Sequence, residues 1–319
     1  MGTELLKRRR FGTSLLEVPP IAVGCAPLGD MRETFLYSVP EDQAIATVLA
    51  ALSSPIDYID TAGWYGDGES ERRIGLALKE LGGLPQGAIL QTKVGRSPDL
   101  FDFSGEIVKR RFERSMALLG VDHFDTVFLH GPETTPFDAA MAPGGPVDVL
   151  RGYYEQGVFD HFGVASDKSD VDMEYLKTGL FDAVISSNRY TLLNTNSDEL
   201  FTYAAERGIA VLNAAPYGSG ILSRGPRNYP RYFYRAAPPA IVERALAIEA
   251  ICERHGVPLA AAALQFSLRD SRITVTIAGM SKPERIQETM GFASLEIPDE
   301  LWEKIEALGP PDTSDPGAT

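Results

Sequence analysis

Short apolar segments alternate with helical segments along most of this chain, and this alternation restricts the possible folds more than any other feature. The apolar segments have the length of strands, and the segments between them have the spacing of amphipathic helices. A helix follows each predicted strand, which is typical of an α/β fold with a parallel sheet, and eight such units predict a closed (β/α)8 TIM barrel. The predicted strands are 20–25, 56–60, 88–93, 124–129, 159–165, 183–187, 209–214 and 273–278.

Other segments depart from this repeat. A Gly12-Thr13 turn predicts an N-terminal hairpin over residues 5–17. A Gly-, Pro- and Tyr-rich loop (216–239) and an extra helix (240–255) interrupt the alternation, and we expect both to lie over the barrel mouth. Another helix is predicted near the C-terminus over 299–308. We expect a single domain over residues 1–319 with a flexible tail over about 310–319, where the composition is polar. The helices predicted within the repeated units include 41–52, 69–81, 104–119, 147–155, 170–177 and 198–206.

The acidic composition limits the classes of partner. The formal net charge is −14 and the pI is about 4.8, which argues against nucleic acid and against an anionic membrane surface. Cys25 and Cys252 lack the spacing of a metal site, so we expect reduced thiols, no metal and a cytoplasmic location. We also expect no secretory signal and no membrane span, because no sufficiently long apolar run occurs. A small-molecule partner is therefore expected, and the oligomeric state stays open.

Four polar residues stand at or just beyond the ends of three predicted strands. Asp60 ends one strand, and Tyr65 follows it in a glycine-rich turn. Lys93 ends the next strand and His130 follows the third. Because parallel strands place their carboxyl ends at one edge, where α/β barrels carry out their chemistry, we expect the four side chains to meet there.

Together these groups have the chemistry of a proton-transfer set. A tyrosine hydroxyl has a pKa of ~10, and an adjacent lysine ammonium lowers that pKa by favouring the phenolate. Asp60 would keep Lys93 charged, and His130 would orient a carbonyl oxygen or share the proton. The set suits the interconversion of a carbonyl and an alcohol. Taken singly, the residues also fit simpler roles: a solvated lysine, a core histidine, and an aspartate that caps the helix beginning at Glu69.

The chain resembles the aldo-keto reductase family from about Arg9 to about Ala293. The stretch Asp57-Tyr58-Ile59-Asp60-Thr61-Ala62-Gly63-Trp64-Tyr65-Gly66-Asp67-Gly68-Glu69-Ser70, with Gly75 after it, is similar to the family signature. Thr92-Lys93-Val94 and Leu129-His130-Gly131-Pro132 are similar to its next two catalytic blocks. The resemblance implies Tyr65 as the general acid/base, Lys93 and Asp60 as the groups that tune it, and His130 as the substrate orienter. Residues 189–193 and 256–266 resemble the aldose 1-dehydrogenase branch, to which pyridoxal 4-dehydrogenase is similar.

A proton-transfer set of this kind needs a hydride partner, which side chains cannot supply. A Rossmann fingerprint is missing, because Gly66-Asp67-Gly68 lacks the third glycine. The loops after the seventh and eighth strands, 216–222 and 279–285, instead fit a barrel-type phosphate site, although either could be an ordinary connection. Arg285 stands in the first turn of the following helix, where it can reach a phosphate. These loops favour NAD or NADP as the cofactor.

The resemblance adds detail to this cofactor site. It implies that Ser166 binds the nicotinamide amide and that Glu288 and Thr289 contact adenine. Asp167, Ser187 and Ala214 replace the asparagine, glutamine and aromatic residue usual in the family, and Gly279 replaces a lysine that often anchors the 2′-phosphate. Arg285 and Lys282 remain as cations, so we lean towards NAD. The candidate cofactor residues are Gly24, Cys25, Ser166, Ser187, Pro216, Gly218, Gly220, Leu222, Gly279, Ser281, Arg285, Glu288 and Thr289.

The leading functional hypothesis is an NAD(P)-dependent oxidoreductase that oxidises an aldose, such as L-fucose, L-galactose or D-arabinose, at C1 to the lactone. Trp64 and Tyr190 are candidates for its substrate pocket, and further aromatic residues are available to shape it: Phe35, Tyr37, Tyr217 and those within 229–234. An alternative is an NADPH-dependent reductase of small aldehydes or ketones, or an enzyme similar to pyridoxal 4-dehydrogenase. The remaining hypotheses are a barrel that binds nucleotide without catalysis and a hydrolase that uses Asp60 and another carboxylate, for which Glu69 is the sequence candidate.

Overall fold

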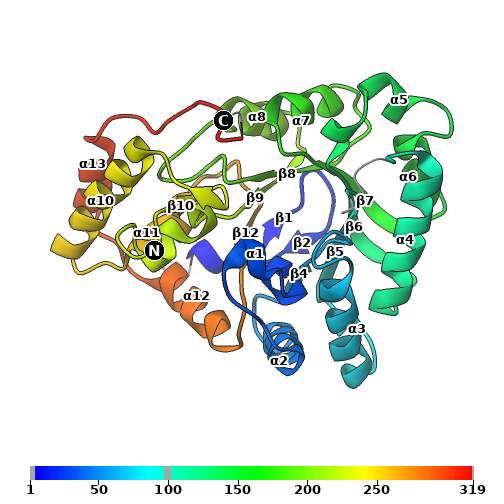
Figure 1. Cartoon of the computed structure of the whole chain (residues 1–319), viewed down its shortest axis with the longest axis horizontal. Helices are drawn as coiled ribbons and strands as arrows, with labels where there is room; N and C mark the ends of the chain where they lie inside the picture. Colours follow the sequence, from blue (N-terminus) through cyan, green and yellow to red (C-terminus); the bar gives the residue numbers. More distant parts are fainter. Residues whose placement is uncertain (1–3, 97–101, 318–319) are drawn as a thin grey trace.

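The computed structural model describes residues 4–96 and 102–317, and its centre is a closed barrel of parallel strands (Figure 1). The strands follow one another around the barrel in the order β12-β3-β4-β5-β6-β7-β8-β9, and pairing of β12 with β3 through Gly279 and Gly24 closes it. The predicted α/β (β/α)8 barrel is therefore confirmed. The barrel strands are β3 (Ile21–Gly24), β4 (Tyr58–Asp60), β5 (Ile89–Gly95), β6 (Phe124–His130), β7 (Phe159–Ala165), β8 (Ala183–Ser187), β9 (Ala210–Ala214) and β12 (Val275–Gly279).

Helices surround the strands, and their ends follow local capping signals. The Ser104 hydroxyl accepts a hydrogen bond from the Ile107 amide at the start of α4, whereas Gly82 and Gly120 end α3 and α4 in the left-handed conformation that favours glycine. These signals explain why the predicted helix limits agree closely with the observed ones. The barrel helices are α2 (Glu41–Leu52), α3 (Glu69–Leu81), α4 (Gly105–Leu119), α6 (Pro146–Glu155), α7 (Ser169–Leu176), α8 (Asp198–Glu206), α11 (Leu259–Leu268) and α12 (Glu284–Ser294).

The predicted N-terminal hairpin is also present, where it covers the amino ends of the barrel strands. Its strands β1 (Arg9–Arg10) and β2 (Glu17–Val18) pair antiparallel. The Phe11 side chain is buried in the apolar cluster inside the barrel. The Arg9 guanidinium donates hydrogen bonds to the carbonyls of Leu268 and Ile273, just before β12. The hairpin therefore closes one end of the barrel and leaves the other for the loops.

The interruption after β9 contains more structure than predicted. The loop 216–239 holds the short helices η4 (Gly218–Gly220) and α9 (Ile221–Arg224) and a hairpin of β10 (Arg231–Tyr232) and β11 (Arg235–Ala236). The extra helix α10 (Pro239–Arg254) packs with α11 and α13 (Asp299–Glu306) beside the barrel (Figure 1). The loop therefore reaches the barrel mouth, and the expectation that α10 would lie over the mouth is wrong. The remaining short helices are η1 (Glu4–Leu6), η2 (Ala26–Gly29), α1 (Arg32–Phe35), η3 (Pro132–Thr134) and α5 (Phe137–Met141).

The C-terminal segment lies against the barrel up to Gly317, although the sequence favoured a flexible tail. Its backbone follows the loop after β8: the Thr195 amide donates to the Asp312 carbonyl at 2.8 Å, and the Asn194 side chain donates to the Ser314 carbonyl at 2.9 Å. Polar tail residues are thus held by backbone and amide hydrogen bonds rather than by an apolar face, which hydrophobic patterning does not detect. The last two residues of the predicted tail lie outside the described residues. Within residues 4–96 and 102–317, no helix is long and apolar enough to cross a membrane.

Candidate active site

A cavity of about 650 Å³ opens at the carboxyl ends of the barrel strands. The residue that ends each of seven barrel strands lines it, and on β5 the lining residue is Lys93, two positions before the strand ends. The seven are Gly24, Asp60, His130, Ala165, Ser187, Ala214 and Gly279. The cavity therefore lies where a (β/α)8 barrel places its functional groups.

Asp60, Tyr65 and Lys93 form one connected group at the floor of this cavity. The Lys93 ammonium lies 2.7 Å from an Asp60 carboxylate oxygen and donates a hydrogen bond to the Tyr65 hydroxyl at 3.1 Å. A third hydrogen bond, to the Thr61 carbonyl at 2.8 Å, completes the three donors of the ammonium. Gln91 donates to the same Asp60 oxygen at 2.5 Å, so the carboxylate is fixed from two sides.

The loop after β4 holds Tyr65 in place because two chain segments pass unusually close together. Gly66 has a φ of +64°, and a Cβ at this position would lie 2.1 Å from the Gly29 carbonyl oxygen. Only glycine fits both the conformation and the space. The glycine-rich turn seen in the sequence thus lets the β4 loop pack against the loop after β3, which fixes the Tyr65 backbone over Lys93.

The charges at this site follow from burial and from the Lys93–Asp60 pair. Burial raises the pKa of Tyr65 above its usual value, and this effect outweighs the opposing influence of the Lys93 charge. The prediction that Lys93 lowers the tyrosine pKa is therefore wrong in its net direction. Lys93 does oppose the effect of burial, but the net shift is upward, so the Tyr65 hydroxyl is protonated at neutral pH. Burial alone would lower the pKa of Lys93, yet Asp60 and Tyr65 raise it overall, so the ammonium stays charged.

His130 completes the predicted set. Its ring lies edge-on to the Tyr65 ring with 6.3 Å between centroids. Burial, helped by the charges of Lys93 and Arg96, holds the pKa of His130 well below its usual value, so the imidazole is neutral. Its Nδ1 is buried and has no hydrogen-bond partner within the part of the chain that the structure describes. A neutral imidazole can orient a substrate oxygen by hydrogen bonding without competing for the Tyr65 proton.

The cavity continues from this proton-transfer set to the loops after β9 and β12. Gly24, Ala214 and Gly279 leave room along its floor, since a Cβ at Gly279 would meet only Pro27, at 3.7 Å. At the far end the side chains are polar and include two arginines, Arg224 and Arg285. A cavity of this volume, lined by arginines near the β9 and β12 loops and by the Tyr65 hydroxyl near β4, fits a nicotinamide dinucleotide. The candidate cofactor residues that line it are Gly24, Ser166, Ser187, Gly220, Gly279, Ser281, Arg285, Glu288 and Thr289.

Cys25, Pro216, Gly218 and Leu222 were also candidate cofactor residues, but they do not line the cavity. Cys25 and Leu222 are fully buried, and burial raises the pKa of the Cys25 thiol above its usual range. They lie in the right loops but face the packed interior. Periodicity is absent from such loops, so the sequence does not indicate which residues face the ligand.

The prediction that Tyr190 forms part of the substrate pocket is wrong. Its hydroxyl donates to the Asp270 carboxylate at 2.6 Å, and its ring stacks on Phe266 with 5.3 Å between centroids. It therefore packs between the barrel and α11, outside the cavity. Glu69 also lies outside the cavity, where it pairs with Arg72 and Arg73. Glu69 therefore cannot act as the second carboxylate of the hydrolase hypothesis.

Trp64 lines the cavity as predicted, beside a charged pair that the sequence did not reveal. The Arg96 guanidinium lies 4.9 Å from the Trp64 ring centroid and pairs with the Asp167 carboxylate. Asn188, in the left-handed conformation, lines the same region. Arg96 and Asp167 follow the ends of two different strands, β5 and β7. Their position just past a strand end is therefore the only sequence signal that could have marked them as cavity residues. Within the described residues, no group of three or more His, Cys, Asp or Glu side chains could hold a metal ion.

Comparison with known proteins agrees with this geometry. The sequence profile of the aldo/keto reductase family matches residues 20–310. The chain is 30% identical to a D-threo-aldose 1-dehydrogenase from Pseudomonas sp over 91% of its length and 94% of that protein. It is 29% identical to pyridoxal 4-dehydrogenase from Microbacterium luteolum, over 97% of this chain and 99% of the other, and 27% identical to L-galactose dehydrogenase from Arabidopsis thaliana, over 95% and 94%.

A solved structure shows the same architecture. The aldo-keto reductase AKR11C1 from Bacillus halodurans, in its holo form, superimposes with a TM-score of 0.76 at 25% identity and covers 97% of both chains. The fold, the assembled proton-transfer set, the cavity and the matched sequence profile all agree. The chain belongs to the aldo/keto reductase family and is an NAD(P)-dependent oxidoreductase.

Proposed function

We propose that this chain oxidises an aldose at C1 to the lactone. The observation that carries the proposal is the single Lys93 ammonium bound both to Asp60, at 2.7 Å, and to the Tyr65 hydroxyl, at 3.1 Å. Bound NAD(P) supplies the hydride acceptor. Tyr65, as the phenolate, takes the proton of the C1 hydroxyl, and Lys93 stabilises that phenolate. His130 orients the oxygen at which the carbonyl forms.

A polyhydroxylated substrate suits the region of the cavity beside this set. Arg96, Asp167 and Asn188 provide donors and acceptors, and Trp64 provides an apolar face of the kind that packs against a sugar ring. The similarity to a D-threo-aldose 1-dehydrogenase and to an L-galactose dehydrogenase supports the same substrate class. L-fucose, L-galactose and D-arabinose are therefore the first candidates.

One observation favours a second function, the reduction of small aldehydes or ketones. Burial raises the pKa of Tyr65, so at neutral pH the hydroxyl is protonated and acts as a general acid towards a carbonyl oxygen. Phe35 and Tyr234 add aromatic surface to the cavity, which also suits a flat substrate such as pyridoxal. The similarity to a pyridoxal 4-dehydrogenase supports testing pyridoxal separately, as a substrate for oxidation.

A substrate panel with a Tyr65→Phe variant tests the proposal. The panel contains L-fucose, L-galactose, D-arabinose, pyridoxal and simple aldehydes, each with NAD(H) and NADP(H). We expect an aldose to give the highest kcat/KM in the wild type. We expect Tyr65→Phe to keep its melting temperature and its cofactor affinity while kcat falls ~10²–10⁴-fold, because only the transferable proton is lost.

Two results would contradict this expectation. Near-full turnover by Tyr65→Phe would show that another group carries the proton. A wild type that reduces aldehydes but oxidises no aldose would replace the first function with the second.

A further inference from the structure

Arg189 is a buried cation behind the carboxyl ends of β7 and β8. Its side chain is 1% exposed. The guanidinium donates to the Asp167 carbonyl and, at 3.2 Å, to the Ser187 carbonyl. It also lies over the Phe233 ring, 4.8 Å from the ring centroid. Arg189 thus links its own segment after β8 to the loop after β7 and to the turn of the β10–β11 hairpin, although it does not line the cavity itself.

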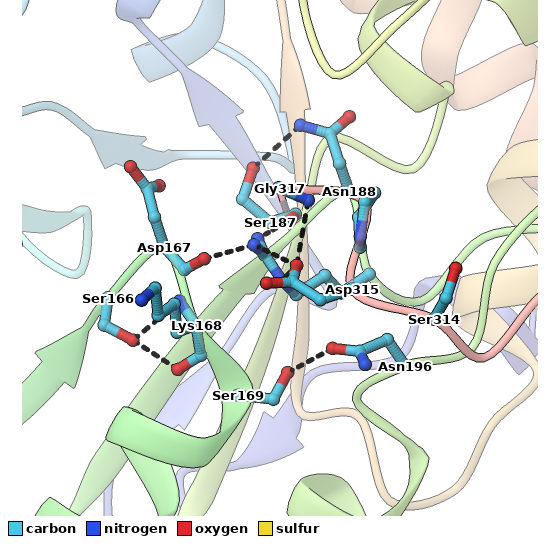
Figure 2. Close-up of polar contacts among 12 residues, drawn as sticks. Ser166, Asp167, Lys168, Ser169, Ser187, Asn188, Asn196, Ser314, Asp315 and Gly317 are labelled. Atoms are coloured by element: carbon cyan, nitrogen blue, oxygen red, sulfur yellow. Dashed lines mark hydrogen bonds and ion pairs between the residues drawn. The ribbon is translucent and has the colours of Figure 1, made fainter. Parts of the chain in front are cut away.

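The counterion of Arg189 is Asp315 of the C-terminal tail, which is labelled in Figure 2. One Asp315 carboxylate oxygen accepts from the arginine Nη2 at 2.7 Å and from Nε at 3.1 Å. The Gly317 amide donates to the same oxygen at 2.9 Å, and a Cβ at Gly317 would lie 2.9 Å from Arg189 Nη2. Within the described part of the chain, Asp315 is the only carboxylate that forms an ion pair with Arg189.

The tail is held in this position at several points. Asp312 exchanges backbone hydrogen bonds with the loop after β8, through the Thr195 amide and the Leu193 carbonyl. The Asn196 side chain donates to the Thr313 carbonyl at 3.0 Å, and Arg235 of β11 donates to the Pro316 carbonyl. We call residues 312–317 the C-terminal strap. These contacts place Asp315 beside the buried guanidinium of Arg189, which forms an ion pair with no other carboxylate in the described part of the chain.

Each group that Arg189 holds belongs to the wall of the cavity near the proton-transfer set. Asp167, Ser187 and Phe233 all line it. Figure 2 labels Asp315, Ser187 and Asp167, and the Arg189 guanidinium donates hydrogen bonds to all three. Asp167 and Ser187 are also the positions where this chain departs from the usual nicotinamide-binding residues of its family. At position 187 a serine thus stands where the longer glutamine is usual, and at position 167 a carboxylate replaces an amide of the same length, while the backbone of this wall is fixed from behind.

We propose that Arg189 is a positioning residue for the nicotinamide end of the cofactor site, and that the C-terminal strap keeps it in place through Asp315. The inference rests on the proposed function only in placing the nicotinamide beside Tyr65. It differs from a purely fold-stabilising role because the carbonyls held by Arg189 belong to cavity-lining residues. Loss of the Asp315 charge should therefore affect the nicotinamide end of the dinucleotide and leave the adenosine end, around Arg285 and Thr289, unchanged.

The test compares Asp315→Asn with Asp312→Asn. Both changes remove one carboxylate charge from the strap and preserve side-chain shape, but among the residues that the structure describes the Asp312 side chain bonds only Ser314. NAD⁺ and ADP-ribose, which lacks nicotinamide, are titrated against each full-length variant. We expect Asp315→Asn to weaken NAD⁺ binding about tenfold and ADP-ribose binding by less than about twofold. Asp312→Asn should resemble the wild type, and Asp315→Glu should restore most of the NAD⁺ affinity.

Equal weakening of NAD⁺ and ADP-ribose, or no weakening of either, in a folded Asp315→Asn variant would overturn the inference. A thermal melt of each variant establishes folding. Turnover gives a second readout: misplacement of the nicotinamide should lower kcat more than it raises the KM for the sugar. A wild type that oxidises no aldose would contradict the proposed function. The role of the strap would still be tested, because the NAD⁺ and ADP-ribose titrations need no sugar.

Discussion

Lys93 is the residue on which the charge balance of the site depends. It opposes the effect of burial on the pKa of Tyr65, and its own charge is retained because Asp60 and Tyr65 raise its pKa. Oxidation requires the Tyr65 phenolate. Because the pKa of Tyr65 is raised, we expect the oxidation rate to increase with pH through the alkaline range, whereas reduction, which uses the protonated hydroxyl, proceeds at neutral pH.

Replacing Lys93 with Met should shift this pH dependence. Without the ammonium, the pKa of Tyr65 rises further, so the alkaline rise in oxidation moves to higher pH and kcat at a fixed pH falls by ~10²-fold or more. The measurement is kcat against pH for both proteins in the oxidative direction. An active Lys93→Met variant with the wild-type profile would contradict the coupling between the two side chains.

We expect the preference between NAD and NADP to depend on individual charges at the other end of the cavity. Arg285 forms an ion pair with Glu288, and both line the cavity. A 2′-phosphate would compete with this carboxylate for Arg285, and position 279 is a glycine rather than a lysine, although Arg224 also lines the cavity. We expect NAD to serve at least as well as NADP in the wild type.

Two substitutions separate the contributions to this preference. Arg285→Ala should weaken NADP more than NAD, since one charge-assisted hydrogen bond contributes ~1.5–3 kcal/mol. Glu288→Gln should improve NADP selectively, because the competing charge is gone. The measurement is kcat/KM with NAD and with NADP for the wild type and for each of the two variants. A strong wild-type preference for NADP that Arg285→Ala leaves intact would show that the 2′-phosphate binds elsewhere.

At the scale of elements, α3 and β5 meet through a buried acid. Glu71 of α3 is 1% exposed and accepts a hydrogen bond from the Thr92 hydroxyl of β5 at 2.6 Å. Burial raises the pKa of Glu71 to about 7. Because this folded-state pKa exceeds that of the unfolded chain, the stability associated with the neutral acid is fully present below the unfolded pKa of ~4.3 and is lost as the pH rises through 7.

Glu71→Gln should therefore remove a pH dependence of folding. The amide keeps the hydrogen bond to Thr92 but cannot ionise, so the free energy of unfolding should fall less between pH 5 and 8 than in the wild type, by ~1–3 kcal/mol. Denaturant unfolding at both pH values gives the difference. Glu80→Gln, an exposed acid on the same helix, is the control. Identical pH dependence in wild type and Glu71→Gln would mean that Glu71 does not titrate in this range.

The elements that the sequence predicted well are those with a repeating apolar pattern or a capping residue. The limits of α2, α3 and β8 coincide with the predicted ones because periodicity and glycine signals agree there. The β10–β11 hairpin was missed, since strands of two residues carry no period. The contacts of the tail leave no sequence signal for a related reason: they are made to carbonyls, amides and one buried arginine, whereas sequence patterns report apolar faces.

At the scale of the whole molecule, the candidate site also contains some residues that the sequence could predict and others that it could not. Asp60, Tyr65, Lys93 and His130 were recognisable because a barrel gathers its strand ends at one edge, and the structure brings all four together. Cys25, Leu222 and Tyr190 lie in or near suitable segments but face the packed interior. The pairing of Arg96 with Asp167 depends on the relative position of two strand ends, which no local pattern contains.

The two ends of the barrel should also respond differently to mutation. The N-terminal hairpin places Phe11 inside the barrel, 1% exposed, at the end opposite the cavity. Removing a buried phenylalanine side chain costs ~3–5 kcal/mol of unfolding free energy. Phe11→Ala should thus lower the melting temperature, while kcat at 25 °C stays within about twofold of the wild type, because the change is distant from Tyr65. Tyr65→Phe should show the reverse: its kcat should fall strongly, and its melting temperature should stay unchanged. A large loss of kcat in a folded Phe11→Ala variant would show that the hairpin end of the barrel is coupled to the active site.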